Sequence, residues 1–294
     1  MTTSVVLTGT GVPRPDPRRA GPGVLITTDE VALQFDAGRA TTMRMAEAGI
    51  TAAALDAVFI THHHSDHVVG LVDIVMSRWL QGRPPPAPLA IVAPVGPSAR
   101  FVQRMLDPWD DDIAVRSYES PAGGPTFDLQ AFDPSDGVEP IEVWTVGGVT
   151  VTALAVHHEP VEQAVGYRIS TPDGVIAISG DTVACAEVEQ LAASADVLVH
   201  EAFHRAAVEP FFDAAPHLRA VADYHADTPA IGASAARAGV ATLLLTHLVP
   251  APSTPAEEQS FIDAVRAGGY QGEIIVGHDL TTVTLPPGAL PPTQ

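Results

Sequence analysis

The sequence predicts a layered α/β domain in which helices cover the outer faces of two packed β-sheets. Short apolar, β-branched runs alternate with helical patterns along most of the chain. Apolar residues make up 46% of the 294 residues and charged residues only 17%, which is enough for a large core and argues against disorder. Two strand patterns close in sequence, 149–156 and 165–170, add an antiparallel hairpin.

The individual elements follow from this alternation. Strand candidates are short apolar and β-branched runs bounded by turn residues, namely 5–7, 24–27, 31–35, 57–60, 89–92, 149–156, 165–170, 175–178, 197–199, 241–245 and 273–276. Helix candidates have apolar residues at helical spacing, namely 41–48, 68–80, 97–106, 183–192, 229–238 and 255–267. No repeat at a fixed short period interrupts this order, so we expect one domain over residues 1–285.

Two segments stand apart from this domain. The proline-containing tail, 286–294, is expected to be flexible or to lie loosely on the surface. The stretch 107–142 contains ten acidic residues and one base, Arg116. It is either a solvated surface excursion, or an insertion that acts as a lid or a dimer contact.

Charge and cysteine content exclude several classes of function. The chain has 35 acidic and 15 basic residues, all of the latter arginine, for a formal charge of −20. Such a body repels a phosphate backbone, so nucleic acid is an unlikely partner. With Cys185 as the only cysteine, neither an intrachain disulfide nor a cysteine-based zinc site is available. The N-terminus has no signal-peptide pattern and no apolar run is long enough to span a membrane, so we expect a soluble, cytoplasmic protein without a membrane partner.

The strongest functional signal is Thr61-His62-His63-His64-Ser65-Asp66-His67, between an apolar strand and an apolar helix. In an extended segment, His62 and His64 project to the same side. Asp66 and His67 follow at the turn into the helix. Two imidazoles for one metal ion, and a carboxylate with an imidazole for a second, suit zinc and similar divalent ions.

This motif, His62-x-His64-x-Asp66-His67, resembles the signature of the metallo-β-lactamase superfamily, whose fold is a four-layer αββα sandwich. The segment Leu7-Thr8-Gly9-Thr10-Gly11 resembles the start of the ribonuclease Z and arylsulfatase-like branch. Phe35-Asp36-Ala37-Gly38 resembles the Asp-x-Gly that the family has after an early strand. The resemblance covers nearly the whole chain and implies a metal-dependent hydrolase.

The resemblance also implies the remaining ligands. A third histidine is expected after a later strand, where both His157 and His158 are candidates, and Pro160 favours His158. The bridging carboxylate corresponds to Asp181, in Ser179-Gly180-Asp181-Thr182, with a helix N-cap as its alternative role. The last ligand corresponds to His247, in Leu-Thr-His, unless it is an ordinary loop histidine.

The implied ligand sets define two metal ions. The first set is His62, His64, His158 and Asp181, and the second is Asp66, His67, Asp181 and His247. Zinc is the expected metal, with Mn²⁺ or Fe²⁺ as alternatives. Because His63 replaces the glutamate of the diiron redox branch, iron redox chemistry is disfavoured.

Three further residues carry predicted roles in catalysis. His225 matches the proton donor of the ribonuclease Z branch, or else only precedes a helix cap. His200 and Glu201 resemble that branch's His-Glu-Ala and either orient a ligand or His225, or are structural. Asp66 is also expected to accept the proton of the attacking water. His204, His217 and His278 receive no role.

The predicted function is hydrolysis of a small ester by a dinuclear zinc enzyme, with a phosphodiester or sulfate ester favoured. The alternatives are ribonuclease Z-type tRNA 3′ processing, lactone or β-lactam hydrolysis, and a non-hydrolytic metal-binding or redox protein. Ribonuclease Z members commonly carry a long arm between the third histidine and the bridging aspartate, whereas only 22 residues separate His158 from Asp181. A homodimer is a further expectation.

Overall fold

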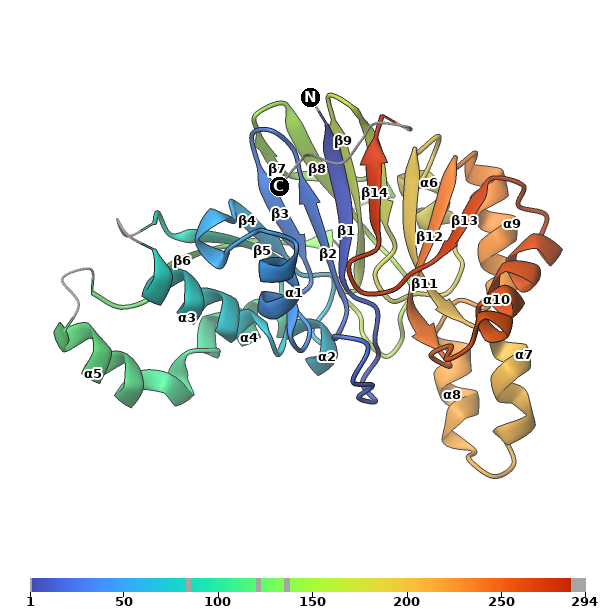
Figure 1. Cartoon of the computed structure of the whole chain (residues 1–294), viewed down its shortest axis with the longest axis horizontal. Helices are drawn as coiled ribbons and strands as arrows, with labels where there is room; N and C mark the ends of the chain where they lie inside the picture. Colours follow the sequence, from blue (N-terminus) through green and yellow to red (C-terminus); the bar gives the residue numbers. More distant parts are fainter. Residues whose placement is uncertain (1, 83–85, 120–122, 135–137, 287–294) are drawn as a thin grey trace.

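The computed structural model describes residues 2–82, 86–119, 123–134 and 138–286. In this part of the chain, two seven-stranded mixed sheets pack face to face and helices cover both outer faces (Figure 1). The first sheet has the order β14-β1-β2-β3-β4-β5-β6, and the second has the order β13-β12-β11-β10-β9-β8-β7. The predicted αββα fold is therefore confirmed.

The bounds of the elements are as follows. The strands are β1 (Thr3–Gly9), β2 (Gly23–Thr27), β3 (Ala32–Phe35), β4 (Ala57–Phe59), β5 (Leu89–Pro94), β6 (Phe127–Phe132), β7 (Ile141–Val146), β8 (Val149–Ala155), β9 (Val165–Thr171), β10 (Gly174–Ile178), β11 (Val197–Phe203), β12 (Thr242–Val249), β13 (Glu273–Val276) and β14 (Thr282–Leu285). The α-helices are α1 (Thr41–Glu47), α2 (Ser65–Val68), α3 (Leu71–Gln81), α4 (Pro97–Arg104), α5 (Asp110–Glu119), α6 (Ala186–Leu191), α7 (Arg205–Val208), α8 (His217–Asp223), α9 (Thr228–Ala238) and α10 (Pro255–Ala267). Short 3₁₀ turns are η1 (Ala52–Ala54), η2 (Asp107–Trp109) and η4 (Glu209–Phe211).

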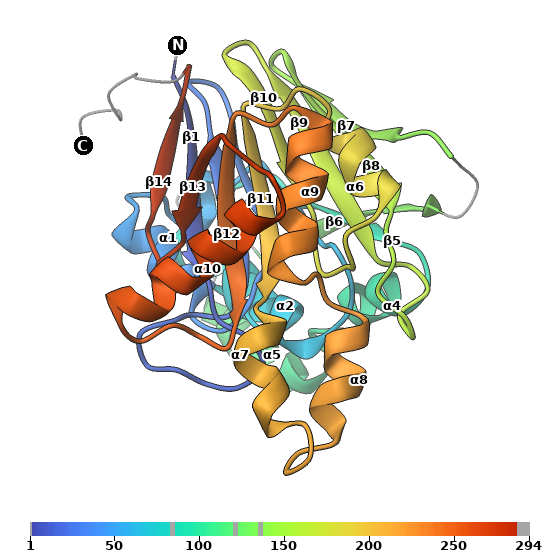
Figure 2. The same cartoon turned by 90° about the vertical axis from the view of Figure 1, so that its right-hand side faces the viewer.

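The core between the sheets joins both halves of the chain. It includes residues from Val5 in β1 to Leu285 in β14. At its centre, the rings of Phe35 and Phe59 stack at 4.6 Å, and Tyr167 of the second sheet packs against both. The helices α1, α3 and α4 cover the first sheet, and α6, α9 and α10 cover the second (Figures 1 and 2). Both faces of each sheet are buried, so most strands consist of nearly continuous apolar residues. These strands are therefore visible in the sequence as short apolar runs.

Several predicted elements needed correction. The helix predicted over 68–80 begins at Leu71 as α3, because Val68 ends the separate helix α2 and Gly70 lies between the two. A Cβ atom there would lie 2.2 Å from the Gly38 carbonyl oxygen, so the chains approach closely at this break. The helix predicted over 183–192 begins only at Ala186. The short α7 and α8, and the edge strand β14, were not predicted.

The acidic stretch 107–142 is not simply a surface excursion. It contains α5, β6 and the first part of β7. β6 and β7 are the last strands of the two sheets, paired in parallel with β5 and antiparallel with β8. Their exposed positions carry polar side chains such as Asp128 and Gln130, because edge strands have one solvated face, and this polarity hid them from the sequence analysis. A lid or dimer role for this stretch stays a prediction, and the tail predicted from 286 lies outside the described residues after Pro286.

No helix in the described ranges is both long and apolar enough to cross a membrane.

The carboxylate of Asp279 ties the N-terminal loop of the first sheet to the C-terminal end of the chain. It accepts hydrogen bonds from the Thr10 amide (3.1 Å) and hydroxyl (2.9 Å), the Ala20 amide (2.7 Å) and Arg44 Nε (2.9 Å). The same loop continues to Pro22 and Gly23, which line a pocket together with His67, Asp181 and His247. Asp279 therefore positions one wall of that pocket.

We expect Asp279→Asn to lower the free energy of unfolding by about 2–4 kcal/mol, because it removes a largely buried ion pair and charge-assisted hydrogen bonds. Urea denaturation measures the change. Asp111→Asn, at an exposed position of α5, is the matched control and is expected to change stability by less than about 0.5 kcal/mol. Equal stabilities of the two variants would contradict this role of Asp279.

Candidate metal centre

The predicted ligands converge in two clusters. Asp66 and His67 belong to α2, which lies at one end of the sandwich (Figure 1). His62 and His64 follow β4, His158 follows β8, Asp181 follows β10, and His247 lies within β12. In the second sheet β10, β11 and β12 run parallel, so their carboxyl ends share one edge. Open α/β sheets place ligand sites at this edge.

The first cluster contains His62, His64, His158 and Asp181. Nε2 of His158 lies 3.3 Å from Nδ1 of His64 and 3.9 Å from Oδ2 of Asp181. Nε2 of His62 also lies 3.9 Å from Oδ2 of Asp181. His64 is half-buried, and the other three side chains are buried.

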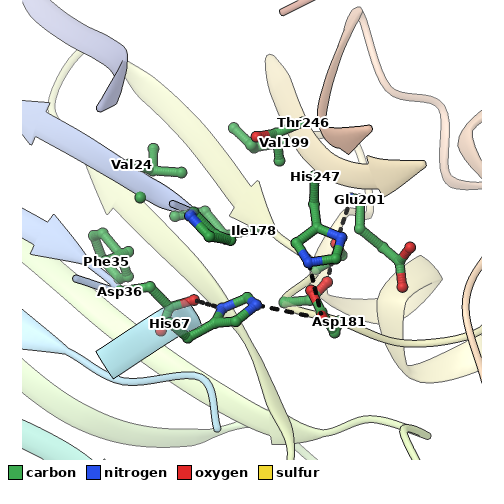
Figure 3. Close-up of a pocket in the computed structure, with 14 residues that line it drawn as sticks. Val24, Phe35, Asp36, His67, Ile178, Asp181, Val199, Glu201, Thr246 and His247 are labelled. Carbon is green, nitrogen blue, oxygen red and sulfur yellow. Dashed lines mark hydrogen bonds and ion pairs between the residues drawn. The ribbon is translucent and has the colours of Figure 1, made fainter. Parts of the chain in front are cut away.

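The second cluster contains Asp66, His67 and His247, all buried. Nε2 of His247 lies 3.5 Å from Oδ2 of Asp66, and Nε2 of His67 lies 3.7 Å from it. Both imidazoles also face Oδ2 of Asp181, at 3.4 and 3.3 Å (Figure 3). A single Asp181 oxygen therefore lies within 3.9 Å of four imidazole nitrogens, two from each cluster.

The donor atoms of both clusters fit divalent cations. Buried polar atoms normally have hydrogen-bond partners. Here Nε2 of His62, His67 and His247 and Oδ2 of Asp66 are buried without one. Imidazole nitrogens and carboxylate oxygens that converge in this way are the donor set for zinc and related ions, which would satisfy these atoms together. The clusters thus have the character of a dinuclear metal site.

Two backbone irregularities aim ligands at the centre. Gly180 has a φ of 63°, and a Cβ atom there would lie 2.7 Å from the Val165 carbonyl oxygen, so glycine permits the turn that presents Asp181. His247 has a φ of 45° and is the extra residue of a bulge in β12, between the partners of Glu201 and Ala202. Bulges redirect a side chain in this way near functional sites.

Hydrogen bonds donated by Nδ1 orient two of the imidazoles. Nδ1 of His67 donates to Asp36 at 2.7 Å (Figure 3). Asp36 also accepts from the Thr61 amide and hydroxyl, both at 2.8 Å. Nδ1 of His158 donates to the main-chain carbonyl of Tyr224 (3.0 Å). These bonds leave Nε2 of both rings facing the centre, as metal-ligating histidines require. In the sequence, Asp36 is marked only by the family pattern Asp-x-Gly, and Tyr224 carries no signal because its main chain makes the contact.

The charges of the clusters are strongly coupled. Burial lowers the pKa of His62 well below its usual value. Burial acts the same way on His67, but the carboxylates of Asp181 and Asp36 outweigh it and raise its pKa well above the usual value. Although burial opposes it, the neighbouring His247 and His67 hold the pKa of Asp181 well below its ordinary range. Asp181 is therefore a carboxylate, which is the form that binds a cation.

Of the two adjacent histidine candidates, His158 lies in the cluster and His157 does not. His157 is half exposed, and its ring nitrogens face Glu159 (3.5 Å) and Glu187 (3.3 Å) on the surface. Asp181 is not a helix N-cap, because α6 begins five residues later, after Cys185.

His225 and Glu201 form a buried pair beside the clusters. Nδ1 of His225 donates to Oε1 of Glu201 at 2.7 Å, and the same oxygen accepts from the Thr182 amide at 2.8 Å. Burial opposes protonation, but the charge and hydrogen bond of Glu201 raise the pKa of His225 to about 9. A nitrogen of His225 lies within 4.8 Å of ligand atoms of Asp181 and His247, so the protonated imidazole lies beside the centre.

The other histidines contribute no atom to these clusters. His200 is buried and its Nδ1 donates to the Glu201 carbonyl at 2.7 Å. His204 contacts the Thr228 hydroxyl at 3.2 Å, and His278 lies 3.0 Å from Glu258. His217 is the first residue of α8.

Comparison with known proteins agrees with this geometry. A protein of Mycobacterium sp. (strain KMS) named ribonuclease Z is 38% identical over 97% of this chain and 96% of its own. The chain belongs to the ribonuclease Z-related family of metallo-β-lactamase fold proteins. A family model described as "Anti-Pycsar protein Apyc1" also matches residues 4–209 of this family member.

Solved structures show the same fold at low identity. The metallo-β-lactamase fold protein YhfI of Bacillus subtilis superposes with a TM-score of 0.68 at 20% identity, over 96% of this chain and 99% of its own. Human tRNase Z, short form, superposes with a TM-score of 0.67 at 21% identity, with the same coverage. With its buried His/Asp clusters and its ribonuclease Z relatives, the protein is a metal-dependent hydrolase of the phosphodiesterase type.

We expect His158→Ala to reduce bound zinc from about two ions per chain to about one or fewer, because it removes an inward-facing nitrogen from the first cluster. His157→Ala is the matched control and is expected to keep the full zinc content, because that ring faces surface glutamates. Elemental analysis of the dialysed proteins measures both. Zinc loss only in the His157 variant would reverse the assignment.

Proposed function

We propose that the protein hydrolyses a small phosphodiester, with a nucleoside cyclic phosphate as the leading candidate and a sulfate ester as the alternative. The observation that carries the proposal is the shared oxygen of Asp181 between two clusters of donor atoms. In this proposal, His62, His64, His158 and Asp181 would hold one zinc ion, and Asp66, His67, Asp181 and His247 would hold a second. Such cations would supply an activated water and would stabilise the charge that develops around phosphorus.

The protein's own residues then handle the protons. His225 is suited to protonate the leaving oxygen, because Glu201 keeps its ring oriented and favours its protonated form. Asp66 is the residue that we propose accepts the proton of the attacking water, because its buried carboxylate lies in the second cluster with His67 and His247. Tight positioning of both groups next to one centre is what acid–base catalysis of ester cleavage requires.

The segment between His158 and Asp181 favours a small substrate. Most of it forms β9 and β10, an antiparallel pair in which Thr171 lies opposite Gly174. Only Pro172 and Asp173 lie between the strands, so no protruding arm is present at this position. A tRNA-binding enzyme of this kind would need contacts well beyond the centre, whereas a small ester needs only the centre and a few nearby donors.

The ion pairs of the surface arginines also favour a small substrate over a polyanion. Polyanion binding needs cations that are free to contact phosphates. Several arginines are instead paired with this chain's own acids, namely Arg18, Arg44, Arg104, Arg116, Arg205, Arg219 and Arg237. The guanidinium of Arg168 is also engaged, because it donates to the carbonyls of Leu191 and Ala193.

The second candidate is tRNA 3′ processing. It is favoured by the name ribonuclease Z of relatives that match nearly the full length of the chain. The same clusters and the same His225 would serve both reactions, so substrate measurements decide between them.

We expect the zinc-loaded protein to hydrolyse nucleoside cyclic phosphates or bis(p-nitrophenyl) phosphate with a kcat/KM at least about 10²-fold above that for a tRNA precursor, because several arginines in the described part of the chain are paired with its own acids. Both substrates are assayed with one preparation, together with a chromogenic sulfate ester. Efficient cleavage of the tRNA precursor at its 3′ junction, with negligible turnover of every small ester, would overturn the proposal in favour of the second candidate.

We expect His225→Ala to lower kcat by about 10²–10⁴-fold for an alkyl phosphodiester and much less for a nitrophenyl ester, because a good leaving group needs little protonation. Zinc content should be unchanged. His278→Ala, a surface histidine paired with Glu258, is the control and should leave both rates intact. Equal losses for good and poor leaving groups would show that His225 positions the substrate rather than donating a proton.

A further inference from the structure

Tyr224 lies against two residues of the candidate centre. It follows α8 directly and precedes His225 in the sequence. Its ring lies 5.3 Å from the ring of His158, nearly perpendicular to it, and 5.0 Å from the ring of His225. Its carbonyl also accepts the hydrogen bond that orients His158. The main chain of Tyr224 therefore contacts a proposed ligand, and its ring packs against both that ligand and the proposed proton donor.

This residue lies on the accessible side of the centre. Among the seven clustered ligands, His64 alone is half-buried and the other six are buried. A substrate therefore approaches past His64 and the neighbouring His158. Tyr224 is itself half-buried and packs against His158, at the base of the α7–α8 projection that extends from this end of the molecule (Figure 2).

The hydroxyl of Tyr224 is available as a donor. The buried tyrosines use theirs internally: Tyr167 donates to the Ile60 carbonyl at 2.7 Å, and Tyr270 to the Ala241 carbonyl at 2.9 Å. In the described part of the chain, the Tyr224 hydroxyl has no such partner, although the ring is held by the contacts above. A positioned phenol without a protein partner, beside a centre for an anionic ester, is free to bind an oxygen of that ester.

We propose that Tyr224 is a substrate-binding residue whose hydroxyl donates a hydrogen bond to one non-bridging oxygen of the phosphodiester. This inference rests on the proposed function. A donor held in place by packing is most effective where negative charge increases during the reaction, so the bond strengthens as the phosphate approaches its transition state. Because the residue lies on one side of the centre, it contacts only one of the two non-bridging oxygens. Tyr224 thereby contributes to the choice of a phosphodiester over an uncharged ester.

The experiment compares Tyr224→Phe with wild type on the Rp and Sp diastereomers of a nucleoside cyclic phosphorothioate. Sulfur accepts hydrogen bonds poorly, so replacing the contacted oxygen already removes the bond in one diastereomer. We expect the variant to lose about 10–100-fold in kcat for the oxygen substrate. We also expect the ratio of the two diastereomer rates to change by about 10-fold. Zinc content should stay at the wild-type value.

The matched control is Tyr118→Phe, which removes the hydroxyl of a tyrosine that is 94% exposed on α5 and should change none of these quantities. Equal effects on both diastereomers, an unchanged oxygen-substrate rate, or loss of zinc in Tyr224→Phe would each overturn the proposal. So would a Tyr224→Ala variant that loses activity while Tyr224→Phe keeps it, because this result would assign the effect to the ring.

Inorganic phosphate, titrated by calorimetry into the zinc-loaded proteins, tests the contact without turnover. We expect Tyr224→Phe to weaken phosphate binding by about 5–20-fold and Tyr118→Phe to leave it unchanged. Failure of the wild type to cleave any small phosphodiester would refute the proposed function, yet the phosphate titration would still test Tyr224. Equal phosphate affinities in wild type and Tyr224→Phe would overturn the Tyr224 proposal alone.

Discussion

The buried carboxylate of Asp181 is the constraint on which the rest of the site depends. One of its oxygens faces four imidazole nitrogens that come from three different segments of the chain. Burying these groups is costly unless they are paired, and several of their atoms have no partner within the protein. Cations between them would turn this cost into a source of stability, because binding to the folded state alone stabilises that state.

The two sheets must keep a fixed position relative to each other for this arrangement to exist, because each sheet supplies some of the clustered residues. His62–His67 come from the end of the first sheet, and Asp181 and His247 come from the second. Contacts between the sheets lie directly behind the motif: Tyr167 donates to the Ile60 carbonyl (2.7 Å), and the Val165 amide donates to the Thr61 carbonyl (3.0 Å). The apolar core and the clusters are thus joined over a few residues, so packing there controls the geometry of the ligands.

In an enzyme of this fold, residues outside the clusters determine which substrate is accepted. The clusters suit many esters, since cations and a proton donor act on the bond being broken rather than on the rest of the substrate. The tight β9–β10 turn, the paired arginines and Tyr224 lie around this shared chemistry. In our proposal, the features that limit substrate size or charge therefore lie in loops and on the surface, where the fold tolerates variation.

The sequence by itself determined the fold class and the chemical character of the centre. Apolar runs report burial directly, and His62–His67 form a local pattern whose spacing alone places the donor groups together. Tertiary structure decided what depends on long-range contact. It placed His158, which Pro160 already favoured in the sequence, in the cluster, and turned the neighbouring His157 toward surface glutamates. It paired Glu201 with His225, 24 residues away, and it brought Tyr224 against His158. It also placed the polar edge strands β6 and β7, because their pairing energy comes from backbone hydrogen bonds to neighbouring strands, which leave little trace in local composition.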